Sequence, residues 1–184
     1  MDLLISLWLP IVLSSVAVFF VSFLLWAVLP IHEKDFSPMS DDKALCDGVR
    51  AANLPPGHYM FPYAATAADR KSKEFEARYK AGPSGVITIF RPVNMGVNML
   101  LTFATFVAVS FLIGYLLSIT LQRGNDFWRV FQVATTVGIL AYSFSQIPNQ
   151  IWFQATRGAK ISCFVGGVLY GITTGLVFAL LWPK

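Results

Sequence analysis

The sequence predicts an all-α transmembrane protein: a four-helix membrane bundle with a small α+β extramembrane subdomain inserted between helices 1 and 2. Four long stretches contain no Asp, Glu, Lys or Arg, namely 3–32, 92–122, 130–156 and 161–183. Each can supply the ~20 apolar residues that cross ~30 Å of hydrocarbon. Composition agrees, because 55% of the 184 residues are hydrophobic and only 13% are charged. These observations divide the chain into a first helix within 1–30, a subdomain over 31–96 and three helices within 97–184.

The first helix is expected over about 4–29, beginning near Trp8 and stopping at Pro30. Proline is tolerated in a first turn, as at Pro10, but cannot continue a helix. The chain start has no basic n-region, the apolar stretch exceeds the usual ~7–15 residues of a signal peptide, and no small-residue cleavage site follows it. We therefore expect a retained membrane helix.

The segment 31–96 alternates helix and strand signals. Ser40 and Thr66 resemble N-caps, and Asp69 completes a capping box with Thr66. Two β-branched or aromatic runs are bounded by Gly and Pro, which is typical of short strands. The predicted order is a helix over about 41–53, a strand over 58–61, a helix over about 67–80 and a strand over 86–90.

The remaining spans are expected at about 97–119, 129–147 and 162–182, with Pro148 and Pro183 ending the third and fourth. The short connection between the second and third spans contains Gly-Asn-Asp. This turn chemistry predicts an antiparallel helix pair.

Charge asymmetry predicts the orientation of the spans. Four crossings place both termini on one side together with three basic residues, while the other side receives eleven Lys and Arg. Cytoplasmic loops carry the excess of Lys and Arg. Residues 31–96 are therefore predicted to be cytoplasmic.

Several partner and activity classes are disfavoured. Nine Lys and Arg and eight Asp and Glu share residues 31–96, so that segment lacks the basic face that nucleic acid requires. The interior of the spans contains no Asp, Glu, Lys or Arg, which argues against a pump or coupled transporter. The spacings of His32, Cys46 and His58 match no closed zinc pattern. We expect no catalytic site, no metal, no cofactor and no enzyme activity, and we read Cys46 and Cys163 as small apolar side chains.

Small residues recur every four positions within the spans. The fourth span has Gly167, Gly171 and Gly175, and the second has Ser110, Gly114 and Ser118. Such spacing creates a helix face that another backbone can approach closely. The pattern is compatible with packing inside one bundle and with an interface to a second copy or another subunit.

Two clusters are candidates for ligand or partner contact. Near Pro148, the amides Gln146, Asn149 and Gln150 precede Trp152, and they either cap freed backbone groups locally or form a neutral hydrogen-bonding site for a lipid headgroup, a quinone or a subunit. In the subdomain, the aromatic residues are Tyr59, Phe61 and Tyr63. They form either a contact patch or the core of the subdomain.

Several local sequences carry a resemblance: Leu-Trp-Leu-Pro in the first span, Leu-Pro-Pro-Gly-His-Tyr-Met-Phe-Pro-Tyr at 54–63, Gly-Pro-Ser-Gly at 82–85 and Gln-Ile-Pro-Asn-Gln-Ile-Trp at 146–152. Over essentially its whole length, the chain resembles a family of uncharacterised four-span bacterial inner-membrane proteins. The resemblance implies a multi-pass protein of the bacterial inner membrane, and the charge asymmetry places both of its termini in the periplasm. It transfers no activity, substrate or catalytic residue.

Two functional classes follow from these observations. The first is an accessory, assembly or stabilising component of a membrane complex, whose partners are the lipid bilayer and other membrane subunits or a second copy of the chain. The alternative is a small channel, transporter or lipid- or quinone-binding membrane protein that uses the amide-rich end of the bundle.

Overall fold

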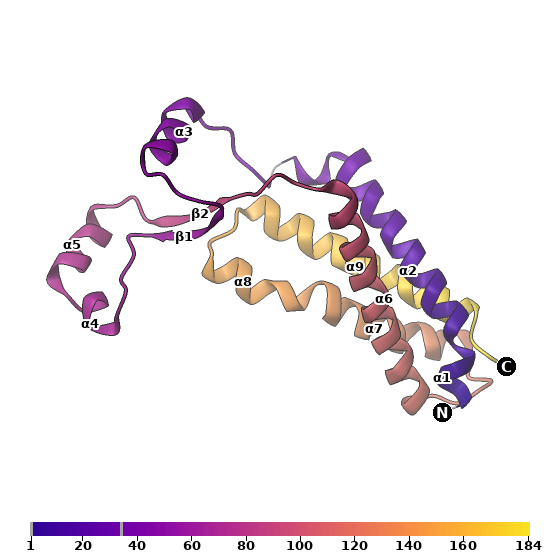
Figure 1. The fold of residues 1–184 in the computed structure, drawn as a ribbon. Helices are drawn as coiled ribbons and strands as arrows, with labels where there is room; N and C mark the ends of the chain where they lie inside the picture. The colour runs from indigo at the N-terminus through magenta and orange to yellow at the C-terminus, as the bar shows by residue number, and fades with distance from the viewer. Residues whose placement is uncertain (1, 34) are drawn as a thin grey trace. The chain divides into compact units, whose positions relative to one another are not determined.

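The computed structural model describes residues 2–33 and 35–184. It is 70% helical, contains four helices long and apolar enough to cross a membrane, and adds one two-stranded sheet (Figure 1). The broad all-α class predicted from the sequence is thereby confirmed. The chain divides into two compact units, a helical unit made of Met1–Ser37 and Asn94–Lys184 and a small unit, Pro38–Val93.

The first span of the helical unit is not a uniform α-helix. A short helix α1 (Asp2–Ser6) precedes α2 (Trp8–Phe23), which continues as a π-helical turn, Leu24–Val28. Pro30 then opens a 3₁₀ turn, Pro30–His32. The start of α2 at Trp8 and the end of the span before Pro30 match the prediction, because the proline ring fits a first turn and not a helix interior.

The other spans begin at side-chain caps. Helices α6 (Met95–Thr120), α7 (Phe127–Tyr142) and α9 (Arg157–Leu180) start after Asn94, Asp126 and Thr156, respectively. Each of these three side chains accepts a hydrogen bond from a backbone N–H of the first turn. The caps satisfy donors that have no partner within the helix.

The third span differs from the prediction. We expected a helix over about 129–147 that Pro148 ends, whereas α7 already ends at Tyr142, and Pro148 lies in the first turn of a further helix, α8 (Ile147–Trp152). A 3₁₀ turn, Phe144–Gln146, joins them. Proline is suited to a first turn, where its missing N–H costs nothing. The predicted helix end was therefore wrong in position and in cause.

The spans pack mainly as α7 on α9, with α2 on both α9 and α6. Helices α6 and α7, which are adjacent in sequence, contact each other less. The connection between them lies beside both chain termini (Figure 1). There the Gly124 N–H donates to Pro183 O at 3.0 Å, and Trp182 Nε1 donates to Gln122 O at 3.0 Å.

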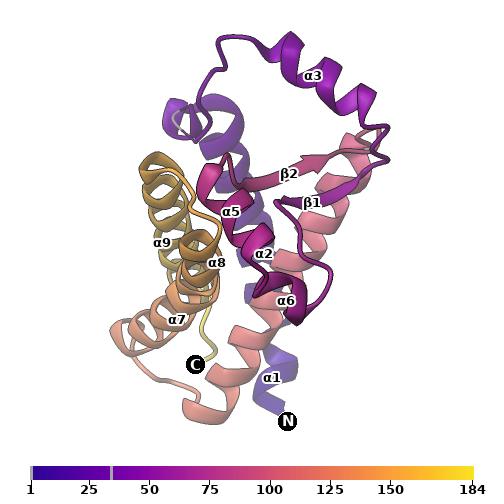
Figure 2. The same cartoon turned by 90° about the vertical axis from the view of Figure 1, so that its left-hand side faces the viewer.

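The small unit contains three helices and the sheet. They are α3 (Asp42–Ala51), β1 (Gly57–Phe61), α4 (Ala67–Arg70), α5 (Lys73–Ala81) and β2 (Gly85–Ile89) (Figure 2). Strands β1 and β2 are antiparallel, with Gly57 opposite Ile89 and Phe61 opposite Gly85.

The expected single helix over about 67–80 is two helices. Thr66 and Asp69 form the predicted capping box of α4, but Ser72 interrupts the helix and its Oγ accepts from Phe75 N to cap α5. Serine competes for backbone hydrogen bonds in this way, which favours a new helix start over continuation.

Candidate functional site

The glycines of the fourth span lie against α7 of the same chain. A Cβ built on Gly171 would lie 2.7 Å from Ile139 N, and one on Gly167 would lie 2.8 Å from Ser143 N. At Gly175, a Cβ would collide with the Thr135 hydroxyl. These positions therefore permit α7 and α9 to approach backbone to backbone.

The second-span residues of the same spacing have different surroundings. Gly114 faces Ile11, whose Cδ1 would lie 3.0 Å from an added Cβ. Ser110 is fully buried, and its Oγ has no hydrogen-bond partner among the described residues. Ser118 is partly exposed and donates to Tyr115 O in its own helix. The three residues thus do not form one uniform contact face.

The amide residues are not gathered into one site. Gln146 lines a cavity of about 290 Å³, whereas Gln150 lines a different cavity of about 330 Å³ between α8 and α9. Asn149 is exposed, and Trp152 is 82% exposed. The Gln146 side chain makes no cap hydrogen bond to α8. Gln146 therefore does not cap the start of α8 with its side chain.

The aromatic residues of the small unit also have separate environments. Tyr59 and Phe61 alternate with Met60 along β1 and so share one face of the sheet. Tyr59 is half-buried and donates its hydroxyl proton to Pro55 O at 2.7 Å. Phe61 is 40% exposed and Tyr63 is 69% exposed. Phe61 and Tyr63 are therefore exposed side chains and do not belong to a closed core.

The cavity that includes Gln146 is lined by both aromatic and polar residues of the helical unit. All four spans contribute to it, near the end of the bundle where α2 leads into the turn Pro30–His32 and α9 begins. Its aromatic walls are Trp26, Phe106, Tyr142 and Tyr170. The lining also includes the polar residues His32, Thr105, Gln146, Ser162 and Cys163.

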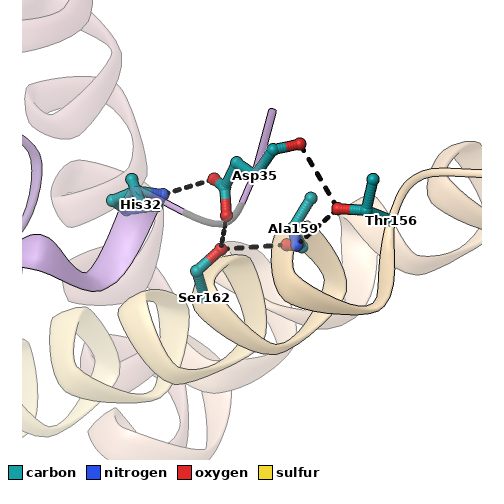
Figure 3. A network of polar contacts seen from close by, with 5 residues as sticks. All are labelled: His32, Asp35, Thr156, Ala159 and Ser162. Carbon is teal, nitrogen blue, oxygen red and sulfur yellow. Dashed lines mark hydrogen bonds and ion pairs between the residues drawn. The ribbon is translucent and has the colours of Figure 1, made fainter. Parts of the chain in front are cut away.

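A polar network holds one wall of this cavity in place (Figure 3). His32 Nδ1 and Asp35 Oδ2 are 2.6 Å apart, and Ser162 Oγ donates to Asp35 Oδ1 at 2.6 Å. The Thr156 hydroxyl donates to Asp35 O at 3.3 Å. The side chains of His32 and Asp35 are only 10% and 9% exposed. The turn that follows the first span is thereby tied to the start of α9.

The same contacts determine the protonation of Asp35. Burial alone would raise its pKa, but the side-chain hydrogen bonds with Ser162 and His32 and the electrostatic interaction with His32 outweigh it. The pKa of Asp35 is lowered from its usual value as a result. The network is therefore built around a carboxylate and not around a carboxylic acid.

A serine, a histidine and an aspartate in contact invite comparison with a hydrolytic triad. In such a triad the imidazole lies between the hydroxyl and the carboxylate, so that it can take the hydroxyl proton. Here the carboxylate of Asp35 lies between Ser162 and His32. The arrangement orients groups and does not activate a nucleophile.

Sequence reasoning missed this site. From the sequence, His32 was considered only as a possible metal ligand, and neither Asp35 nor Ser162 was singled out. Asp35 and Ser162 are 127 positions apart, so no local spacing connects them. Two features of the sequence could have indicated the site: a titratable residue directly after a span and a hydroxyl residue in the first turns of the last span.

Comparisons of the chain with protein-family models, curated proteins and solved structures find no match.

Proposed function

We propose that this protein is an accessory or assembly component of a membrane complex, which works through contact and not through catalysis. Four apolar helices support residence in a membrane. In this proposal, residues 38–93 carry the surface that meets the partner.

The observation that carries the proposal is the absence of buried residues in the small unit. None of its residues from Pro38 to Val93, all of which are described, is buried. A two-stranded sheet is marginal at best by itself in water. A unit of this size without a core needs another surface to support it.

The apolar side chains of this unit would gain from such a surface. Met60, Phe61, Tyr63 and Phe90 are between 40% and 76% exposed. Removal of apolar area from water contributes about 25 cal/mol per Å². Aromatic side chains and methionine are enriched where proteins meet. A membrane-protein subunit that covers them is the partner we propose.

Photo-crosslinking in native membranes tests this proposal. A benzoylphenylalanine placed at Tyr63 is expected to give one discrete adduct with a different polypeptide, and Phe61→Asp should abolish it. The matched control position is Lys71, which is exposed in the polar turn between α4 and α5. Adducts only with lipid or within the same chain would contradict a partner-facing role.

We further propose that the protein lies in the bacterial inner membrane with residues 31–96 in the cytoplasm and both termini in the periplasm. The eleven-to-three distribution of Lys and Arg supports this orientation. Both termini lie at the same end of the helical unit, beside the connection between α6 and α7 (Figure 1).

A further inference from the structure

We propose that the groove between α8 and α9 binds an anionic phospholipid, with an acyl chain in the groove and the phosphate beside Lys160 and Arg157. This binding function goes beyond partner docking by residues 38–93. It uses residues of the helical unit alone, so it does not rest on that docking.

The α8–α9 groove is lined mainly by large apolar side chains. Its volume is about 330 Å³, and its apolar lining consists of Ile147, Ile151, Ile161, Phe164 and Val165. The last four of these are between 40% and 65% exposed, so the groove opens to the outside of the helical unit. Both walls belong to helices that are apolar enough to cross a membrane. In a bilayer, such a surface meets the hydrocarbon chains of lipids.

The groove opens where the close approach of two helices stops. The row of glycines on α9 ends at Gly167, where an added Cβ would lie 2.8 Å from Ser143 N. The position four residues earlier is Cys163, beside Phe164. The Phe164 ring meets the Phe144 ring edge to face, with centroids 5.8 Å apart. Larger side chains take the place of glycine here, so the backbones stay further apart and leave space between α8 and α9.

A half-buried cation is part of the lining. Lys160 and Gln150 are the polar residues of the groove. Arg157 lies three residues before Lys160 and therefore on the same face of α9. Within residues 2–33 and 35–184, neither the Lys160 nor the Arg157 side chain has a hydrogen bond or an ion pair. An unpaired charge beside hydrocarbon is costly, and an anion in contact with it lowers this cost.

The helix dipole adds to the preference for an anion. Arg157 and Lys160 lie in the first turn of α9, which contains no Asp or Glu. The N-terminus of a helix carries about half a positive charge, so it repels cations and attracts anions. One end of an apolar groove therefore presents positive charge from two side chains and from the backbone.

The carboxylate of Asp35 lies at the same end of α9 but on another side of it. Its Oδ1 accepts a hydrogen bond from Ser162 Oγ at 2.6 Å. Ser162 and Lys160 are two residues apart, which separates their side chains by about 200° around the helix. Ser162 accordingly lines the cavity of about 290 Å³, whereas Lys160 lines the α8–α9 groove. The charge of Lys160 is thus available to a ligand in the groove.

A phospholipid fits the groove better than a transmembrane helix of a partner does. Interfaces between membrane helices are enriched in Gly, Ala, Ser and Thr, because small residues let two backbones approach closely. The groove is lined by none of these residues. A flexible acyl chain adapts to bulky apolar walls. Basic pockets between transmembrane helices bind the headgroups of anionic lipids.

The test is native mass spectrometry of the full chain, purified in detergent and titrated with dioleoyl phosphatidylglycerol or, separately, with dioleoyl phosphatidylcholine. We expect the first phosphatidylglycerol to bind at least about fivefold more tightly than phosphatidylcholine, the effect of one Lys or Arg at an anionic lipid. Lys160→Gln should remove this preference by weakening phosphatidylglycerol alone, and Lys160→Arg should retain it. The matched control is Arg129→Gln, which removes a cation from the first turn of α7 at the other end of the helical unit (Figure 1).

The place of the acyl chain is tested separately. Val165→Trp adds bulk in the groove and should weaken both lipids by at least about fivefold. A phosphatidylglycerol with a diazirine on its acyl chain should label residues within 147–165. The Lys160 variants and this labelling decide the question even if Val165→Trp does not fold.

Three outcomes would overturn the proposal. They are equal affinities of the wild type for the two lipids, equal phosphatidylglycerol affinities of Lys160→Gln and Arg129→Gln, and acyl-chain labelling mainly on α6. All three are independent of the crosslinks from Tyr63, so this proposal and the proposed function fail separately.

Discussion

Gly138 of α7 and Gly171 of α9 lie backbone to backbone. A Cβ on Gly138 would lie 2.8 Å from Gly171 Cα, closer than real Cβ atoms approach other heavy atoms. In lipid, helices associate through van der Waals packing and hydrogen bonds, and the hydrophobic effect contributes little between them. The close approach of these two glycines therefore explains why α7 and α9 form the most extensive helix contact of the chain.

Gly171→Ala should lower the free energy of unfolding by about 1–3 kcal/mol, because the new methyl group overlaps the backbone of α7 at Ile139. Gly171→Leu should disrupt the bundle. Thermal unfolding in detergent measures both changes. The matched control is Gly166→Ala, whose Cβ has no contact closer than 3.7 Å. Equal unfolding temperatures for Gly171→Ala and Gly166→Ala would show that this contact does not control stability.

Asp35→Asn should destabilise the helical unit by about 1–3 kcal/mol near neutral pH, since it removes the charge from two short hydrogen bonds. The pKa of Asp35 is lowered in the fold. Its contribution is therefore complete above the unfolded pKa of about 3.9 and is lost as the pH falls through the lower folded pKa.

Unfolding measured between neutral pH and about pH 3 checks that sign, because acid should destabilise the wild type more than Asp35→Asn. Ser162→Ala removes one hydrogen bond and is expected to cost less than Asp35→Asn. A wild type and an Asp35→Asn variant with parallel pH profiles would contradict the role assigned to the carboxylate.

Two glycines of the small unit should respond in opposite directions to alanine. Gly82, which ends α5, has a φ of 60° and a ψ of −176°. Only glycine adopts this conformation readily, so Gly82→Ala should cost about 1–3 kcal/mol. Gly48 lies inside α3 with nothing within 4 Å of an added Cβ. Gly48→Ala should stabilise α3 by about 0.5–1 kcal/mol. Hydrogen exchange of α5 and α3 amides measures the two effects, and protection that rises in both variants would refute the strain at Gly82.

Reporter fusions should reveal the orientation. Alkaline phosphatase fused after Lys184 is expected to be active and green fluorescent protein dark there, because phosphatase matures only outside the cytoplasm. A fluorescent protein inserted in the exposed turn at Pro55 and Pro56 should be bright. The opposite pattern would show that the excess of Lys and Arg in 31–96 does not orient this chain.

The sequence by itself determined the number of apolar helices and their approximate positions, because hydrocarbon requires long uncharged stretches. Thr66 begins α4 through a predicted capping box, which is local chemistry that needs no distant partner. The two short strands also followed from local pattern, and the structure shows that they pair. The prediction that the third helix ends at Pro148 was wrong. Proline fits the first turn of a helix as well as it ends one, and the local sequence does not distinguish these two positions.

Only the tertiary structure decided which residues meet. The small-residue spacing predicted a close helix contact but not its partner, and the α7 backbone occupies that place. The link between Asp35 and Ser162, the cavity beside it and the end of α7 at Tyr142 all join segments far apart in the chain. Such contacts arise from the packing of whole helices. Periodicity within one helix reports which face is buried and carries no information about what covers it.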